Sequence, residues 1–198
     1  MSNVPVATTS NILVGSARLL VAPIGTALPT VSSAGVLTWP AAWKEQGATE
    51  KGTDLTYTPT FTDFNVDESP SAVGAALKSE KAVISAVLAE VTMANLATAI
   101  SASTSTPTAP AVGVAGTTEL DIGGAPVVLH MVGLEGISPS GLPRYVIGWK
   151  ALASAAVKQA FQRATPTNIP LSLQLMADLT KAPGQQLLKI VNIDAAGS

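Results

Sequence analysis

The sequence predicts a mainly β protein, either a β-sandwich or a partly closed barrel, with one helix on its flank. Between residues 55 and 62, apolar residues alternate with threonines. This period of two is typical of a strand with one apolar face and one hydroxyl face. Several further segments are rich in Val, Ile and Leu and are separated by Gly, Pro and Ser. Only one segment has the period of an amphipathic helix.

The predicted strands lie between turn signals along the chain. Phe61 and Phe64 are out of phase by one residue, which predicts a β-bulge near Asp63. Residues 151–164 fit either state, because their alanines favour a helix while the surrounding strands favour a sheet, and we expect a strand over 154–162. The other predicted strands are 11–21, 55–64, 79–91, 118–122, 127–134, 144–150, 169–177 and 187–193.

The predicted helix covers residues 92–100. Met93, Leu96, Ala97 and Ile100 recur at helical spacing, and Thr92 is the expected N-cap. The remaining organisation follows from composition. We expect a flexible N-terminal arm over 1–10, a single domain over 11–193, a long loop or hairpin over 39–66, and a low-complexity linker over 101–117.

Charged residues are unusually scarce. They make up 12% of the chain, against about 25% in typical soluble domains. No apolar run is long enough for a membrane helix, so we expect part of the surface to be covered by other subunits. Residues 43–90 carry a net charge of −4 and the remainder +2. This asymmetry is either scatter or the polarity of a head-to-tail assembly.

The sequence contains no pattern that predicts catalysis. His130 is the single histidine and cysteine is absent, so neither a usual zinc site nor a second candidate for a catalytic triad is available. Asp67 and Glu68 are adjacent in a predicted turn, and no glycine-rich nucleotide motif occurs. The net charge of −2 argues against a protein that neutralises nucleic-acid phosphates. We therefore expect no enzyme, no cofactor and no metal.

Five of the eight aromatic residues lie between positions 39 and 64. Buried aromatic residues dominate the energetics of many interfaces, but the same residues also build ordinary cores, and both interpretations stay open. An alternative function is a monomeric β-sandwich that binds carbohydrate or protein. Exposed Trp39 and Trp43 would then form its binding platform.

The order of several segments carries a family resemblance. They are RLLVAPIGTALP at 18–29, WKEQGATEKG at 43–52, SPSAV around Pro70, VLAEVTMANLATAI at 87–100 and IPLSLQLMAD at 169–178. In this order the chain resembles the major tail tube proteins of long-tailed double-stranded DNA bacteriophages. The resemblance spans most of residues 11–193.

This resemblance implies a structural protein of the virion tail, made in the host cytoplasm. Six copies would form a ring around a channel, and rings would stack through a hairpin into the tube that delivers the genome. The implied partners are the protein itself, the tape measure protein and the tail terminator and tip proteins; double-stranded DNA would pass without sequence-specific binding, and no membrane is involved. The implied inter-subunit contacts are Trp43, Gly47, Gly52, Tyr57, Phe61 and Phe64. Candidate channel acids are Glu45, Glu50, Asp54, Asp63, Glu80 and Glu90, with Glu119 and Asp121 as further candidates.

Overall fold

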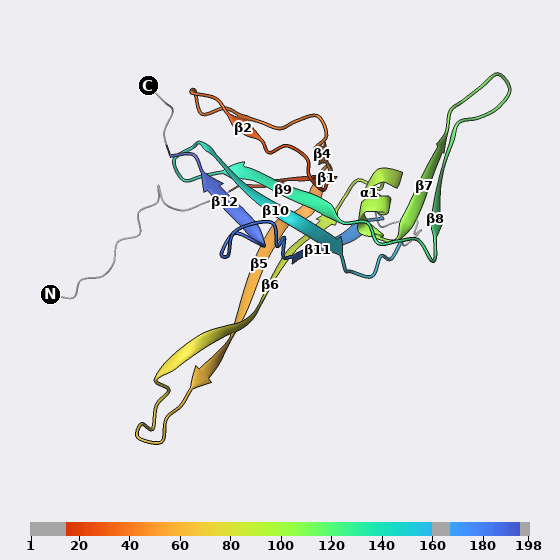
Figure 1. The fold of residues 1–198 in the computed structure, drawn as a ribbon. Coiled ribbons are helices and arrows are strands. Elements are labelled where there is room, and N and C mark those ends of the chain that lie inside the picture. Colours follow the sequence, from red (N-terminus) through yellow and green to blue (C-terminus); the bar gives the residue numbers. More distant parts are fainter. Residues whose placement is uncertain (1–14, 160–166, 195–198) are drawn as a thin grey trace.

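The structure is a computed structural model that describes residues 15–159 and 167–194. Twelve strands and one α-helix occur in this part of the chain, which confirms the predicted fold class (Figure 1). In chain order they are β1 (Arg18–Pro23), β2 (Thr30–Val31), β3 (Leu37–Thr38), β4 (Lys44–Glu45), β5 (Thr49–Phe64), β6 (Gly74–Leu88), α1 (Met93–Ala99), β7 (Ser103–Thr108), β8 (Thr117–Ile122), β9 (His130–Ile137), β10 (Pro143–Ala153), β11 (Ile169–Met176) and β12 (Leu188–Asn192).

Eight strands form the main sheet, in the order β4-β1-β9-β10-β11-β6-β5, with β12 also paired to β10. Every pairing is antiparallel. The long strand β10 pairs with β12 through its first residues and with β11 through its last. β2–β3 and β7–β8 form two separate ribbons. Within residues 15–159 and 167–194, no helix has the length and the hydropathy that a membrane crossing requires.

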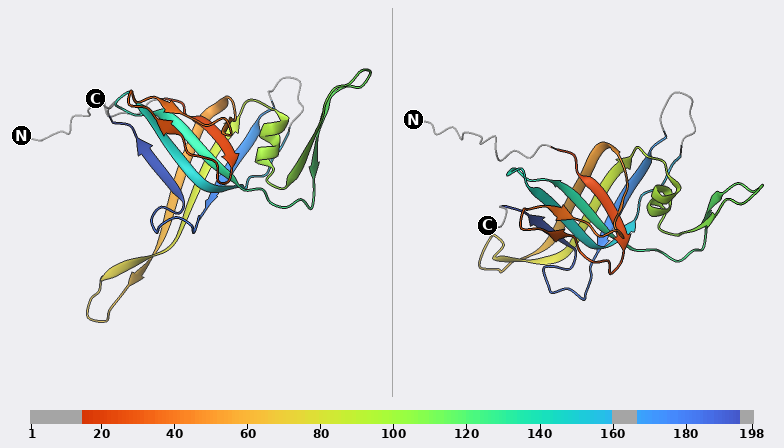
Figure 2. Two further views of the ribbon diagram at one scale, coloured as in Figure 1. Left: turned by 45° about the horizontal axis from the view of Figure 1, so that its top comes forward. Right: turned by 90° about the horizontal axis from the view of Figure 1, so that it is seen from above.

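The main core lies on one face of the curved sheet. Alternate residues of β6 and β11 are buried there, as the period-two pattern predicts. Buried side chains of β1, β9 and β10 and Ala99 of α1 join the same cluster. The neighbouring strands β1, β9, β10, β11 and β6 all contribute to this one cluster. The sheet therefore curves around the core, as in a partly closed barrel (Figure 2).

A smaller core covers the opposite face of β1, β9 and β10. Trp43 and Trp39, from the segment between β3 and β4, pack against Leu20, Ile147 and neighbouring residues of these strands. The two indole rings meet edge to face with their centroids 4.8 Å apart. The rings pack against position 133 of β9, which must be glycine because a Cβ there would lie 2.5 Å from the Trp39 ring.

β5 and β6 form a long hairpin that reaches beyond the body of the subunit (Figures 1 and 2). The last seven residues of β6, from Ala82 to Leu88, also pair with β11 and so belong to the sheet. The first residues of β6 pair, within the described part of the chain, with β5 alone. We call residues 57–81 the arm and residues 65–73, which connect the two strands, its tip.

The predicted hairpin over 39–66 is displaced in the structure. The chain reverses at the tip, whereas Gly47 and Gly52 lie at the base of the hairpin. Both glycines have positive φ, 79° and 80°, a conformation that glycine adopts at low energetic cost. Gly47 forms a corner before β5, and Gly52 lies within a register shift between Thr49 and Thr53. The second shift falls between Thr60 and Phe61, before the bulge predicted near Asp63.

Three further local predictions are resolved by the structure. α1 begins at the expected N-cap, since the Thr92 hydroxyl accepts a hydrogen bond from the backbone N–H of Asn95 at 3.1 Å. The predicted linker over 101–117 is wrong in part, because its Ser/Thr-rich strand β7 pairs with β8. The strand predicted over 154–162 is absent from 154–159, because β10 ends at Ala153. Other predictions lie outside the described residues: the N-terminal segment 1–10, positions 11–14 of the first predicted strand, and residues 160–162.

Candidate functional site

The arm has two chemically different faces. Leu55, Tyr57, Pro59 and Phe61 alternate along β5 and share the face that packs on the core at Leu55. Their register partners on β6 include Ile84 within the core and Leu77 beyond it. Threonines occupy the opposite face, at positions 56, 58, 60 and 62. The alternation predicted from the sequence is confirmed, and the apolar face of the arm continues the core face of the sheet outward.

The apolar face is open to solvent in the single subunit. The exposed fractions are 50% for Tyr57, 58% for Phe61 and 52% for Leu77. Phe64, on the other face near the tip, is 53% exposed. A two-stranded ribbon by itself is at best marginally stable in water. A large apolar face on such a ribbon is therefore typical of a contact surface.

A groove links this face to the body of the subunit. Leu55, Tyr57 and Glu80 form one wall, and Leu188 and Ile190 of β12 contribute to the other. Its volume is about 330 Å³. The Tyr57 hydroxyl donates a hydrogen bond to Glu80 at 2.8 Å across the ribbon, and this bond raises the pKa of Tyr57. The groove and the arm together form one continuous, largely apolar surface.

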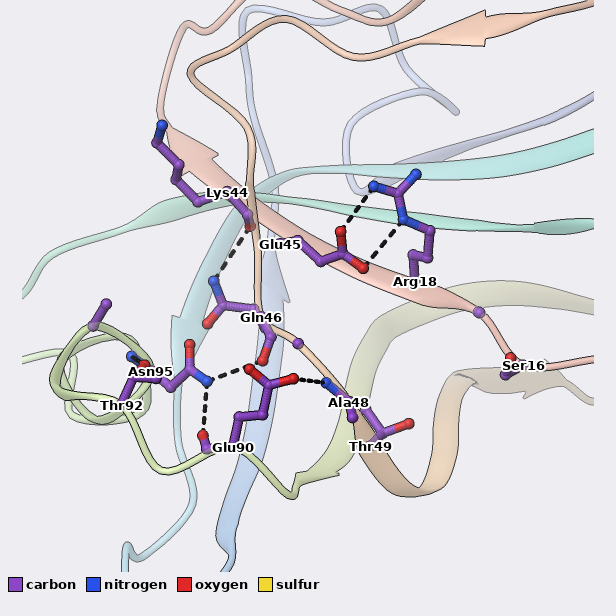
Figure 3. A pocket seen from close by; sticks show the side chains of 13 residues that line it. Ser16, Arg18, Lys44, Glu45, Gln46, Ala48, Thr49, Glu90, Thr92 and Asn95 are labelled. Atoms are coloured by element: carbon purple, nitrogen blue, oxygen red, sulfur yellow. Dashed lines mark hydrogen bonds and ion pairs between the residues drawn. The ribbon is translucent and has the colours of Figure 1, made fainter.

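A larger hollow of about 970 Å³ lies at the base of the hairpin (Figure 3). Its lining comes from 16–18 before and within β1, from 44–49 leading into β5, and from 90–95 after β6. Arg18 bridges Glu45 at 2.8 Å and Glu135 at 2.9 Å. The hydrogen bond from Arg18 lowers the pKa of Glu45.

Asn95 and Glu90 close the other side of the hollow. The Asn95 side-chain amide donates to the backbone oxygens of Gln46 at 2.9 Å and Glu90 at 2.8 Å. The Glu90 carboxylate accepts a hydrogen bond from the backbone N–H of Ala48 at 2.9 Å. A Cβ at Gly47 would lie 2.4 Å from Glu90, so this corner needs glycine. The bonds connect β5, α1 and the preceding loop into a preformed wall.

The structure separates the six predicted contact residues. Tyr57, Phe61 and Phe64 are exposed on the arm, where the prediction of a contact role is retained. Trp43 is 5% exposed and its indole N–H donates to the backbone oxygen of Ala27 at 2.9 Å. It is therefore a core residue of the single subunit, and its assignment as a contact is wrong. Gly47 and Gly52 shape the base of the hairpin instead of reaching outward.

Sequence reasoning missed Leu77 and the hollow. Leu77 lies before the predicted start of the strand at 79, and it pairs with Phe61 only because the register shifts between Thr60 and Phe61. The hollow depends on contacts between segments more than 40 residues apart, as between Gln46 and Asn95. Such contacts leave no local signal in the sequence.

The six candidate channel acids are spread along the hairpin from base to tip. Glu45 and Glu90 line the hollow, while Asp63 lies near the tip. Glu50 accepts a hydrogen bond from the Asn168 side chain at 2.9 Å, and Asp54 is exposed on β5. Glu80 accepts from Tyr57. The remaining candidates, Glu119 and Asp121, are exposed on β8.

The structure also places the candidate residues for catalysis and for aromatic binding. His130 is half-buried at the start of β9, and burial lowers its pKa. Among the described residues, no cluster of three or more His, Asp or Glu side chains could hold a metal ion. Trp39 donates its indole N–H to Glu135 at 2.8 Å and packs on buried Trp43. The exposed tryptophan platform of the alternative prediction is therefore wrong.

Comparison with known proteins does not add a family. No protein-family model matches this chain, and no curated protein matches it.

Proposed function

We propose that this protein is a structural subunit that assembles with copies of itself into stacked rings, forming the tail tube of a long-tailed double-stranded DNA bacteriophage. The observation that carries the proposal is the arm, which leaves the body of the subunit with an exposed apolar face. The family resemblance along the chain supplies the phage setting. In that setting the tube is part of the virion and conducts the genome into the host.

The energetics of the arm favour assembly. Burying a large apolar side chain completely contributes roughly 1.5–3 kcal/mol. Tyr57, Phe61 and Leu77 are each about half exposed, so covering all three contributes about 3 kcal/mol per subunit by the same relation. This is enough to matter for association, particularly when each subunit makes the contact more than once.

The free strand edge gives the second argument. Among the described residues, β5 pairs along its length with β6 alone, which leaves one edge of a 16-residue strand unpaired. Unpaired edges are templates for strand pairing between chains. A head-to-tail contact between identical subunits forms a ring if its rotation closes. The low charge content of the chain reduces the repulsion that such packing would meet.

The remaining parts of the proposal rest on the resemblance. The tape measure, tail terminator and tip proteins would be the other partners, and the channel would pass double-stranded DNA without sequence-specific contacts. The protein would act mechanically, without a catalytic residue, cofactor or metal.

Electron microscopy and sedimentation of the purified full-length chain test this function. We expect rings or tubes at high protein concentration, or on addition of tail partners. Monomers that persist under all of these conditions would refute the proposal. A monomer that binds a glycan would instead support the alternative of a binding module.

A further inference from the structure

The arm keeps a free strand edge on β6. β11 pairs with β6 only over residues 82–88, and β11 ends at Met176. Beyond this residue the chain turns toward β10, where Asp178 forms an ion pair with Lys150 at 3.0 Å. Among the described residues, positions 74–81 of β6 therefore pair with β5 alone, and their other edge is open.

This β6 edge suits strand addition better than the free edge of β5. β5 contains Pro59, which has no backbone N–H to donate, and a proline within a strand lies where its nitrogen faces the unpaired side. Residues 74–81 contain no proline. They do contain Lys78 and Lys81, which are exposed and form no ion pair within the described part of the chain. Lysines on an open edge oppose pairing with most strands, so this edge favours a strand that carries acids.

The ribbon β7–β8 presents a second open edge. Its two strands pair only with each other in the described ranges. β7 contains Pro107, whereas β8 contains no proline, so the outer edge of β8 has a complete set of backbone donors and acceptors. The ribbon and the arm extend from opposite sides of the body (Figures 1 and 2). β8 of one copy is therefore placed to meet the arm of another copy and not its own.

β8 has one acidic face and one apolar face. Glu119 and Asp121 alternate with Leu120 and Ile122, so the acids share one face of the ribbon and the apolar residues share the other. Both acids are exposed and, among the residues described, form no ion pair. Ile122 is 64% exposed. The strand thus carries two unpaired charges that are opposite in sign to the lysines of the β6 edge.

The arm presents matching faces along this edge. Lys81 lies opposite Thr58 on the hydroxyl face, and Leu77 lies opposite Phe61 on the apolar face. Lys78 lies at the register shift between Leu77 and Lys81. A strand added beside β6 places its side chains alternately on the same two faces. One phase of β8 therefore sets its acids on the face of Lys81 and extends the apolar face with its leucine and isoleucine.

We propose that β8 of one copy adds as a further strand to the free edge of β6 in the arm of a second copy, with Glu119 and Asp121 on the same face as Lys81. This inference rests on the proposed self-assembly and names a contact for it. The opposite phase would place both acids on the face of Glu80, which lies opposite Pro59 on the apolar side, so like charges disfavour it. Each copy donates one strand and receives one, and such a head-to-tail contact closes into a ring if its rotation allows.

The ion pairs in this contact select the phase of the added strand. Exposed ion pairs contribute little to affinity, whereas a negative charge on β8 discriminates between the two faces of the arm. The backbone hydrogen bonds of the new ladder and the extended apolar face supply most of the affinity. The charge tests are therefore made at low ionic strength, where exposed ion pairs are least screened.

Charge exchange gives the first test. Lys78→Glu with Lys81→Glu should weaken assembly roughly four- to twenty-five-fold, at about two- to five-fold for each exposed ion pair. Adding Glu119→Lys and Asp121→Lys to the same chain should restore it, because the charges of the two strands are then exchanged. Sedimentation velocity over a concentration series measures the midpoint of assembly.

A matched control separates this pairing from net charge. Lys44→Glu with Lys51→Glu makes the same change in charge at exposed positions outside the β6 edge. It should weaken assembly less than the pair on β6, and the two lysine substitutions on β8 should not rescue it. Circular dichroism of each variant confirms folding.

Disulfide trapping gives the second test. The chain contains no cysteine, so paired substitutions have no background. Ser79→Cys lies on the face of Lys81, and in one chain with Glu119→Cys or with Asp121→Cys it should give a ladder of covalent oligomers on oxidation for one of the two pairs. Thr60→Cys, directly opposite Ser79 on β5, is the control. It would lie two strand spacings, about 10 Å, from β8, which is too far for a disulfide.

The outcomes distinguish this contact from the proposed function. A ladder from Thr60→Cys and none from Ser79→Cys would place the added strand on β5 and overturn the β6 contact. Assemblies that form without either ladder, and in which charge exchange restores nothing, would overturn the strand contact alone. The absence of every oligomer, with tail partners present, would overturn both the strand contact and the proposed function.

Discussion

Replacing Phe61 by asparagine tests the apolar face of the arm directly. The ring is 58% exposed, so the single subunit loses little packing when it is removed. Covering that exposed part in an assembly contributes about 1–2 kcal/mol, in proportion to the roughly 1.5–3 kcal/mol for complete burial. The uncovered amide of Asn adds a desolvation penalty if it finds no partner. We expect the concentration at the midpoint of assembly to rise at least five- to thirty-fold.

Thr60→Asn is the matched control for this change. Thr60 precedes Phe61 on the same strand, is exposed, and points to the hydroxyl face. Both substitutions place the same side chain on the ribbon, so their intrinsic effects on strand formation are similar. Sedimentation velocity over a concentration series gives the midpoint of assembly, and urea unfolding gives the stability of the subunit. Equal midpoints for the two variants would refute the assignment of the apolar face as the contact.

Three further predictions concern single residues of the subunit. Gly47→Ala should lower the free energy of unfolding by about 1–3 kcal/mol through positive φ and the clash with Glu90, whereas Gly52→Ala, with positive φ but open space, should lower it less; urea unfolding of both would compare them. Burial lowers the pKa of His130, so the unfolded chain, with a pKa near 6.5, binds the proton more tightly than the folded chain. The free energy of unfolding should therefore decrease as the pH is lowered below about 6.5; His130→Gln should flatten this pH dependence, and an unchanged dependence would contradict the assignment. Gln46→Met should leave unfolding stability unchanged or raise it by up to about 1 kcal/mol by removing the unpaired acceptor; thermal unfolding measures this, and a clear loss of stability would contradict it.

Strands and the helix were predictable where their signals are local. The alternation of β11 and the buried half of β6 reports directly which side chains face the core. Thr92 marks the start of α1, because its hydroxyl accepts a hydrogen bond from a backbone N–H of the first turn. Such signals depend on neighbours within four residues and do not require knowledge of the fold.

The geometry of the hairpin could not be predicted in the same way. Glycine with positive φ serves a reversal, a corner or a bulge equally well, so Gly47 and Gly52 were assigned to the wrong place on the hairpin. The position of Trp43 depends on the close approach that Gly133 permits, about 90 residues away in the chain. An aromatic residue is a core or a contact residue according to which distant segment lies against it.

The charge asymmetry of the chain now has a structural location. The segment 43–90, with net charge −4, is the hairpin together with its base. Two arms lying side by side in register would place acids near acids. Salt screens this repulsion over roughly 8–10 Å, so it should strengthen the lateral contact, which is apolar. Rising ionic strength should therefore favour assembly, and assemblies that dissociate as salt rises would show that the lateral contact is held by ion pairs instead.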